Sequence, residues 1–313
     1  MEVGVLLKPE FKKNSAREQT FISRYIINHM LEPDARYTRI IMKKASDWRL
    51  KHPLESQNPK GWRRAMFLSG LLATWRATGE EKYLNATINF CKKSCREFSD
   101  CDFISNDFFM SPGVLIRLAL NTDNQDIPVD PSRLGKNTLL ELYDEKENLF
   151  FRDRARRDKF WCFANGCVMA GICHTFEDLP ENHEERAWYE GLLREMSAKI
   201  TEIQSEDGLW RPDLMNSEQH PYPDSGGSAL LCYSIAWGIN NGILAKEQYE
   251  PVARKAWKGL CACVYPDGGL AYVQPLELSD VIYEPDSTDE YATGAFLLAG
   301  EEMLKLMEEN NEN

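Results

Sequence analysis

A carboxylate in an aromatic setting is the first feature of this sequence that could do chemistry. Asp107 lies in the segment 100–113, directly before Phe108 and Phe109 and ahead of a predicted buried helix. An apolar environment raises the pKa of a carboxylic acid, and such an acid can donate a proton near neutral pH. Asp107 is therefore the candidate catalytic residue. Its spacing also fits a helix N-cap, an interpretation that the local pattern alone favours.

Three further loops combine aromatic and polar side chains near predicted helices. Trp161 and Asn165 lie at the start of one apolar helix, Trp210 and Arg211 form a pair in a later loop, and Gln274 stands in the corresponding loop of the next hairpin. An indole offers a flat stacking surface, and a guanidinium can hold a carboxylate through two hydrogen bonds. A single Trp more often packs in a core, but several such loops opening at one end predict a sugar-binding funnel.

A loose internal repeat must position these loops. Copies of it occupy residues 61–83, 165–189 and 226–249, and a partial copy occupies 293–300. Each copy begins with small residues, continues as an apolar helix with almost no charge, and passes through a turn into an amphipathic helix. This alternation predicts a ring of about five or six helical hairpins, with inner helices buried and outer helices half exposed.

The two kinds of helix are clearest in the third copy. The segment 229–238 is apolar all round, which predicts burial on every side. The segment 250–260 has an apolar face and a basic face, which predicts an outer helix. Short β pieces are expected only at 148–151 and 270–273, so the predicted fold class is all-α.

Charge and length exclude several classes of function. The 313 residues carry a net charge of −12, which argues against a nucleic-acid or anionic-membrane partner because no positive field is available to displace counterions. We find no run of 18 apolar residues, no signal peptide and no linker that would divide the chain. We expect one domain, as a monomer or homodimer.

Cysteine usage predicts a reducing compartment. Nine cysteines are an odd number, and most lie in apolar segments, which is typical of buried free thiols in a cytoplasmic protein. Cys91 and Cys95 have no histidine nearby in sequence, and the chain lacks a glycine-rich phosphate loop. We therefore expect neither a metal nor a cofactor.

Several long motifs resemble those of the unsaturated rhamnogalacturonyl and glucuronyl hydrolases, glycoside hydrolase families 105 and 88. The most specific are FWCFANGCVMAGICHTFEDLP from Phe160, DGLWRPDL from Asp207 and YATGAFLLAGEEM from Tyr291. The resemblance implies an (α/α)6 barrel spanning residues 1–313 as one domain. Family-like hairpins would fill 45–307, after an atypical helical segment at 1–45.

The resemblance also implies a reaction. Members of these families act on unsaturated uronyl oligosaccharides left by the breakdown of pectin-type or related polysaccharides. An Asp protonates the C4=C5 double bond, water adds at C5, and the resulting hemiketal collapses to release the sugar. This route differs from the two-carboxylate displacement of most glycosidases.

The catalytic position of this chain departs from the family pattern. Strict alignment places Asn106 where the family has its catalytic Asp, and Asp107 follows one place later. A shift of one residue at the start of a helix turns a side chain by about 100°. The hairpin that supplies a His-Ala-Asp-Asp motif in relatives is missing between Phe90 and Asp102, so the barrel is predicted to be one hairpin short.

The uronate-binding positions also differ. Phe163 and Cys167 stand where relatives have an Arg and a Trp that hold the uronate, and Arg63, Arg64 and Arg152 are alternative sources of the missing cation. Two interpretations follow. The chain is a hydrolase on an unsaturated or altered sugar, or it is a catalytically impaired member that binds a carbohydrate or protein through the same funnel. A helical scaffold without a sugar role explains the retained loops least well.

Overall fold

The computed structural model contains mainly helices. Eight α-helices and one short β-hairpin lie in the part of the chain that it describes. The all-α prediction is confirmed. The described ranges are 32–54, 62–94, 140–151, 157–178, 180–275 and 284–312.

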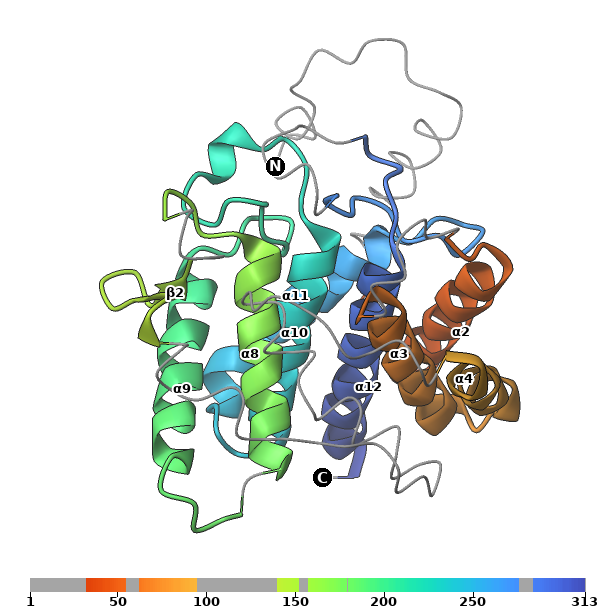
Figure 1. Cartoon of the computed structure of the whole chain (residues 1–313), viewed down its shortest axis with the longest axis horizontal. Coiled ribbons are helices and arrows are strands. Elements are labelled where there is room, and N and C mark those ends of the chain that lie inside the picture. Colours follow the sequence, from red (N-terminus) through yellow and green to blue (C-terminus); the bar gives the residue numbers. More distant parts are fainter. Residues whose placement is uncertain are drawn as a thin grey trace.

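Four helices form an inner layer (Figure 1). In spatial order they are α3 (Trp62–Thr78), α12 (Glu290–Glu312), α10 (Ser225–Asn240) and α8 (Cys162–Asp178), each packed against the next. The chain order differs from the spatial order, because the last helix inserts between the first and third of these inner helices.

The inner helices point in the same direction. Arg63 and Asp289 pair at 2.9 Å where α3 and α12 begin, and Arg76 pairs with Glu301 at 2.5 Å nearer their carboxyl ends. The Trp237 indole donates to Glu177 across the carboxyl ends of α10 and α8. The amino-terminal ends of all four inner helices therefore meet at one end of the molecule.

Helix α10 is the most completely enclosed element. Every residue from Ser225 to Ile239 is buried, which confirms the prediction for 229–238. Its hydroxyl groups find internal partners, as when Ser234 donates to the Leu230 carbonyl at 2.8 Å. Burial of this helix costs little desolvation free energy, because it carries no charge and its serine hydroxyls are hydrogen-bonded within the protein.

Two glycines allow α3 and α12 to approach closely. A Cβ added at Gly70 would lie 2.8 Å from the Gly294 Cα, and one added at Gly294 would overlap the Met66 carbonyl. The contact between these helices is therefore backbone against backbone, and it fixes the spacing of the side chains at their amino-terminal ends.

Four helices form the outer layer. They are α2 (Ala35–Lys51), α4 (Glu81–Ser94), α9 (Arg186–Glu202) and α11 (Lys246–Ala262). Helix α11 contains the predicted amphipathic segment 250–260, and its apolar face is buried as expected. Helix α2 covers α3 and α12 and runs through residue 45, where we expected the family-like hairpins to begin.

Strands contribute little. β1 (Tyr143–Asp144) and β2 (Leu149–Phe150) pair antiparallel with Tyr143 opposite Phe150, which confirms the β piece predicted at 148–151. The β piece predicted at 270–273 is wrong: that loop makes one isolated bridge, Leu270 with Val264, and its other backbone groups bond to neighbouring loops. Among the described helices, none combines the length and the apolar character needed to cross a bilayer.

Candidate active site

The loops that precede the inner helices converge around Tyr291. This residue is fully buried at the start of α12, and its ring lies 4.6 Å from that of Phe163 at the start of α8. Its hydroxyl donates to the Gln274 carbonyl at 2.7 Å. An added Cβ at Gly226 would touch the same ring, so α10 also meets it here. The structure thus brings together the loops around Phe163, Gln274 and the start of α10.

Trp161 is positioned at this end by an isolated bridge to Asp213. Its side chain is buried, and its indole N–H has no hydrogen-bond partner among the described residues. The Lys159 ammonium lies 5.2 Å from the centre of the ring. A buried donor without an acceptor costs free energy unless a ligand or another group completes it. Of the sequence-predicted binding residues in the described ranges, Trp161 is the one with a buried side-chain donor that has no described partner.

Asn165 has a different arrangement. Its Oδ1 accepts from the Phe150 amide at 2.7 Å, while its Nδ2 donates to the Phe150 and Trp161 carbonyls, each at 3.0 Å. These bonds use the oxygen and both amide hydrogens, and the side chain is completely buried. Asn165 therefore clamps β2 onto α8 and holds the backbone of Trp161.

Trp210 and Arg211 are also engaged within the protein. The Trp210 indole is 1% exposed and donates to the Ile200 carbonyl at 2.9 Å. Arg211 pairs with Asp207 at 2.9 Å through Nη1. In this conformation the pair anchors its own loop. The next loop is anchored by the backbone carbonyl of the buried Gln274, which accepts from the Tyr291 hydroxyl.

Asp224 is a buried carboxylate that our sequence analysis missed. It caps α10 by accepting from the Gly227 amide at 3.1 Å, while its Oδ2 has no hydrogen-bond partner. Burial raises the pKa of Asp224 to about 6, although the nearby amides of Gly227, Gly226 and Gln274 oppose the shift. The signal that would have found it is an Asp directly before Ser-Gly-Gly at the start of an apolar helix.

The end of α10 that Asp224 caps joins two of the loops. The Asp224 amide donates to the Trp210 carbonyl at 2.9 Å, and the Trp210 amide donates to Ser228 Oγ at 3.0 Å. Ser225 Oγ donates to the Ala271 carbonyl at 2.7 Å. The loops that contain Trp210 and Gln274 are therefore tied to one helix start.

Three arginines and two carboxylates gather where α2 ends and α3 and α12 begin. Arg63 pairs with Asp289 at 2.9 Å, and Arg64 pairs with Glu290 at 2.5 Å. Arg49 donates to Thr288 Oγ1 at 2.6 Å, and its Nε has no partner. Burial raises the pKa of Asp289 and lowers that of Arg49. Arg63 and Arg64 thus lie at the same end as Phe163, whereas Arg152 lies outside the described residues.

The candidate acid, Asp107, and the strictly aligned Asn106 also lie outside the described residues. Their roles stay predictions. Within the described ranges, the His, Cys, Asp and Glu side chains form no group of three that could hold a metal ion.

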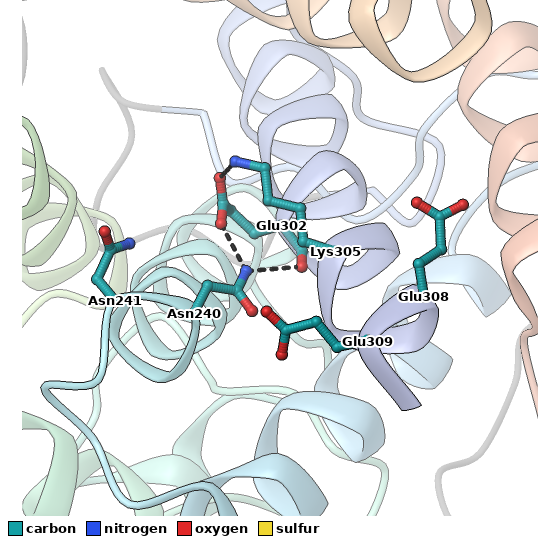
Figure 2. A pocket seen from close by; sticks show the side chains of 6 residues that line it. All are labelled: Asn240, Asn241, Glu302, Lys305, Glu308 and Glu309. Carbon is teal, nitrogen blue, oxygen red and sulfur yellow. Dashed lines mark hydrogen bonds and ion pairs between the residues drawn. The ribbon is translucent and has the colours of Figure 1, made fainter. Parts of the chain in front are cut away.

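A pocket of about 380 Å³ lies at the other end of the inner helices (Figure 2). In it, Asn240 donates to Glu302 Oε2 at 2.7 Å, and Lys305 pairs with Glu302 at 2.6 Å. Glu308 and Glu309 complete an acidic lining. The sequence-predicted residues in the described ranges lie at the amino-terminal ends of the inner helices, away from this pocket.

Two curated proteins are similar to this chain in sequence. An unsaturated 3S-rhamnoglycuronyl hydrolase of Formosa agariphila is 36% identical over 214 residues, which are 64% of this chain and 57% of that protein. A protein of the same name from an Alteromonas species is 36% identical over 172 residues, 52% of this chain and 41% of that protein. The chain thus spans about half the length of these relatives.

Solved structures share the fold. A family 88 glycosyl hydrolase from Bacteroides vulgatus matches with a TM-score of 0.69 and 20% identity, over 87% of this chain and 99% of the other. The unsaturated glucuronyl hydrolase of Bacillus sp. GL1 matches with a TM-score of 0.59 and 13% identity, over 86% and 96%. The helical ring is thus the α/α barrel that the motifs implied. Residues 105–307 match the Glycosyl Hydrolase Family 88 profile, and the chain belongs to that family.

Proposed function

We propose that this protein is a glycoside hydrolase that acts on unsaturated uronyl oligosaccharides. The observation that carries the proposal is the family match over residues 105–307, supported by two relatives that share the name unsaturated 3S-rhamnoglycuronyl hydrolase. The substrate class that these names favour is an unsaturated uronyl residue joined to rhamnose, including rhamnose that carries a sulfate.

In the proposed reaction, Asp107 donates a proton to C4 of the C4=C5 double bond, and water adds at C5. The product is a hemiketal, which opens and releases the remaining sugar without a change in oxidation state overall. An acid with a pKa near the working pH suits this step. The Trp161 indole N–H is the donor we assign to the sugar, because it is buried and has no acceptor among the described residues.

The other sequence-predicted residues have positioning roles in this proposal. Asn165 holds the backbone at Trp161, and Trp210, Arg211 and Gln274 keep the neighbouring loops in place. Loss of the Asn165, Trp210 or Arg211 side chain would displace the rim of the site by a small distance, whereas Gln274 acts through its backbone carbonyl. Such displacements are costly in catalysis, because reacting groups must be aligned closely.

A second candidate function is a family member that binds sugar without turnover. Two observations favour it. Asn106 stands at the strictly aligned catalytic position, and an amide cannot act as a general acid. Phe163, at the position of the family arginine, is buried against Tyr291 and contributes no charge.

Turnover of an unsaturated uronyl-rhamnose disaccharide separates these candidates. We expect the ultraviolet absorbance of the C4=C5 bond to decay with the parent protein. Asp107→Asn should slow this decay by about 10²–10⁴-fold, which is the usual contribution of a general acid.

Asn106→Asp is the matched control, because it places a carboxylate at the strictly aligned position. A gain of activity in this variant, with an inactive parent, would assign the impaired function to the natural chain. The natural chain would also be a binding protein without turnover if the parent left the C4=C5 absorbance unchanged and bound the disaccharide saturably in calorimetry.

We also propose a reducing compartment such as the cytoplasm. The described cysteines at 162, 167, 173, 232, 261 and 263 are buried and carry thiols, not disulfides. Burial raises the pKa of the Cys162 and Cys261 thiols, which keeps them protonated and unreactive.

A further inference from the structure

Where α2 ends and α3 and α12 begin, one arginine has no carboxylate partner among the described residues. We define the arginine cluster as Arg49, Arg63 and Arg64. Asp289 pairs with Arg63 and Glu290 pairs with Arg64, so two carboxylates face three guanidiniums. Arg49 has no ion pair among the described residues and bonds only to the Thr288 hydroxyl and the His52 carbonyl.

The uncompensated guanidinium is also the buried one. Arg49 is 1% exposed, and its Nε has no hydrogen-bond partner. Buried charges are normally paired, because an isolated charge loses its hydration and gains no compensating interaction with the protein. The pKa of Arg49 is lowered by that burial, and the carboxylates of Glu290 and Asp289 only partly oppose this shift. Among the described residues, no carboxylate forms an ion pair with Arg49.

The other two arginines are accessible to a ligand. The side chains of Arg63 and Arg64 are 30% and 24% exposed. Among the described residues, Arg64 makes its hydrogen bond through Nε, to Glu290, and its guanidinium lies 4.8 Å from the centre of the Phe90 ring. A planar guanidinium fixed on an aromatic ring is preorganised for an oxyanion, with little side-chain entropy left to lose.

The cluster also lies at the sugar-facing end. Glu290 directly precedes Tyr291, the residue around which the candidate site converges. An anion that approaches Arg63 and Arg64 would therefore be carried by a molecule at the same end of the barrel.

We propose that the arginine cluster binds an oxyanion of the substrate sugar, either the uronyl carboxylate or a sulfate ester, with Arg63 and Arg64 in contact and Arg49 adding charge behind them. This inference rests on the proposed function for the identity of the sugar. The cluster would supply the cation that Phe163 does not, from the start of α3 rather than from α8.

The test compares Arg64→Gln and Arg63→Gln with Arg76→Gln. Arg76 is the matched control, because it forms an ion pair between the same two helices, with Glu301, farther along both of them. We expect each variant in the cluster to raise KM for the unsaturated disaccharide by about tenfold or more, since charge-assisted bonds are lost. Arg76→Gln should leave KM within about twofold.

Two modified substrates identify the anion. If the cluster binds the carboxylate, the parent and Arg64→Gln should have the same KM for the methyl ester of the disaccharide. If the cluster binds the sulfate, the two proteins should have the same KM for the desulfated disaccharide. Equal KM values for Arg64→Gln and Arg76→Gln on the charged substrate would overturn the inference while leaving the hydrolase function intact.

A binding measurement keeps the inference testable if no substrate is turned over. Inorganic sulfate should raise the midpoint of thermal unfolding of the parent and of Arg76→Gln more than chloride does at equal ionic strength. The difference should vanish in Arg64→Gln and recover in part in Arg64→Lys, which keeps the charge. An identical response of all four proteins would overturn the anion site.

Discussion

At the residue scale, Asp224 couples a titration to the stability of the fold. Its pKa is raised from 3.8 to about 6 because the carboxylate is completely buried. A carboxyl whose pKa is higher in the folded state contributes its full stability below pH 3.8, and this contribution falls as the pH rises through 6. The rise in the pKa from 3.8 to about 6 corresponds to roughly 3 kcal/mol.

Asp224→Asn should therefore stabilise the protein relative to the parent by up to about 3 kcal/mol at pH 7–8, and by nearly nothing at pH 4. Asn still caps a helix well, so the bond from Gly227 is kept. Urea unfolding at pH 4, 6 and 8 measures the difference. A constant difference across this range would mean that the carboxylate is ionised in the folded protein throughout.

At the element scale, the spacing of α3 and α12 depends on glycine. Gly294→Ala places a methyl group against the Met66 carbonyl, so the helices must separate. We expect a loss of about 1–3 kcal/mol in the free energy of unfolding, as for other overpacked contacts. Activity should also fall, because the separation displaces Arg63 from Asp289.

Gly191→Ala is the control for helix propensity. Gly191 lies in α9, and an added Cβ there meets nothing within 4 Å. This variant should be neutral or more stable by up to about 1 kcal/mol, measured in the same urea titration. Equal destabilisation of both variants would show that the close approach of α3 and α12 is not the cause.

At the scale of the whole molecule, α12 joins α3 to the other inner helices. It packs against α3 and α10 in the inner layer and against α2 and α11 outside (Figure 1). Its buried side chains include Tyr291, Phe296 and Met303, each of which contributes about 1.5–3 kcal/mol by burial. Their sum is comparable with the total stability of a typical domain, about 5–15 kcal/mol.

Removal of residues 284–313 should therefore abolish cooperative unfolding, as measured by near-ultraviolet circular dichroism in urea. Removal of residues 310–313 alone should leave a single transition, because the ion pair of Glu301 and the packing of Phe296 are kept. A cooperative transition in the longer deletion would indicate that the first three inner helices in the chain fold without the fourth.

The sequence alone determined the helical class, the buried nature of α10 and the family. The reason is that periodicity, lack of charge and motif order are local properties: the uncharged run at 229–238 has no stable place except an interior. It also placed Trp161 and Asn165 at the start of an inner helix, because apolar helices and their loops alternate along the chain.

Only the tertiary structure decided what these side chains touch. Nothing in the sequence relates Arg49 to Thr288 or Arg64 to Glu290, which are separated by more than 200 residues and meet because the last helix inserts beside the first inner one. Trp210 is also held by a backbone group, the Ile200 carbonyl, and Asn165 by those of Phe150 and Trp161, so the residues predicted to bind sugar position the loops instead. Partners of this kind depend on which helices become neighbours, and the local pattern does not contain that information.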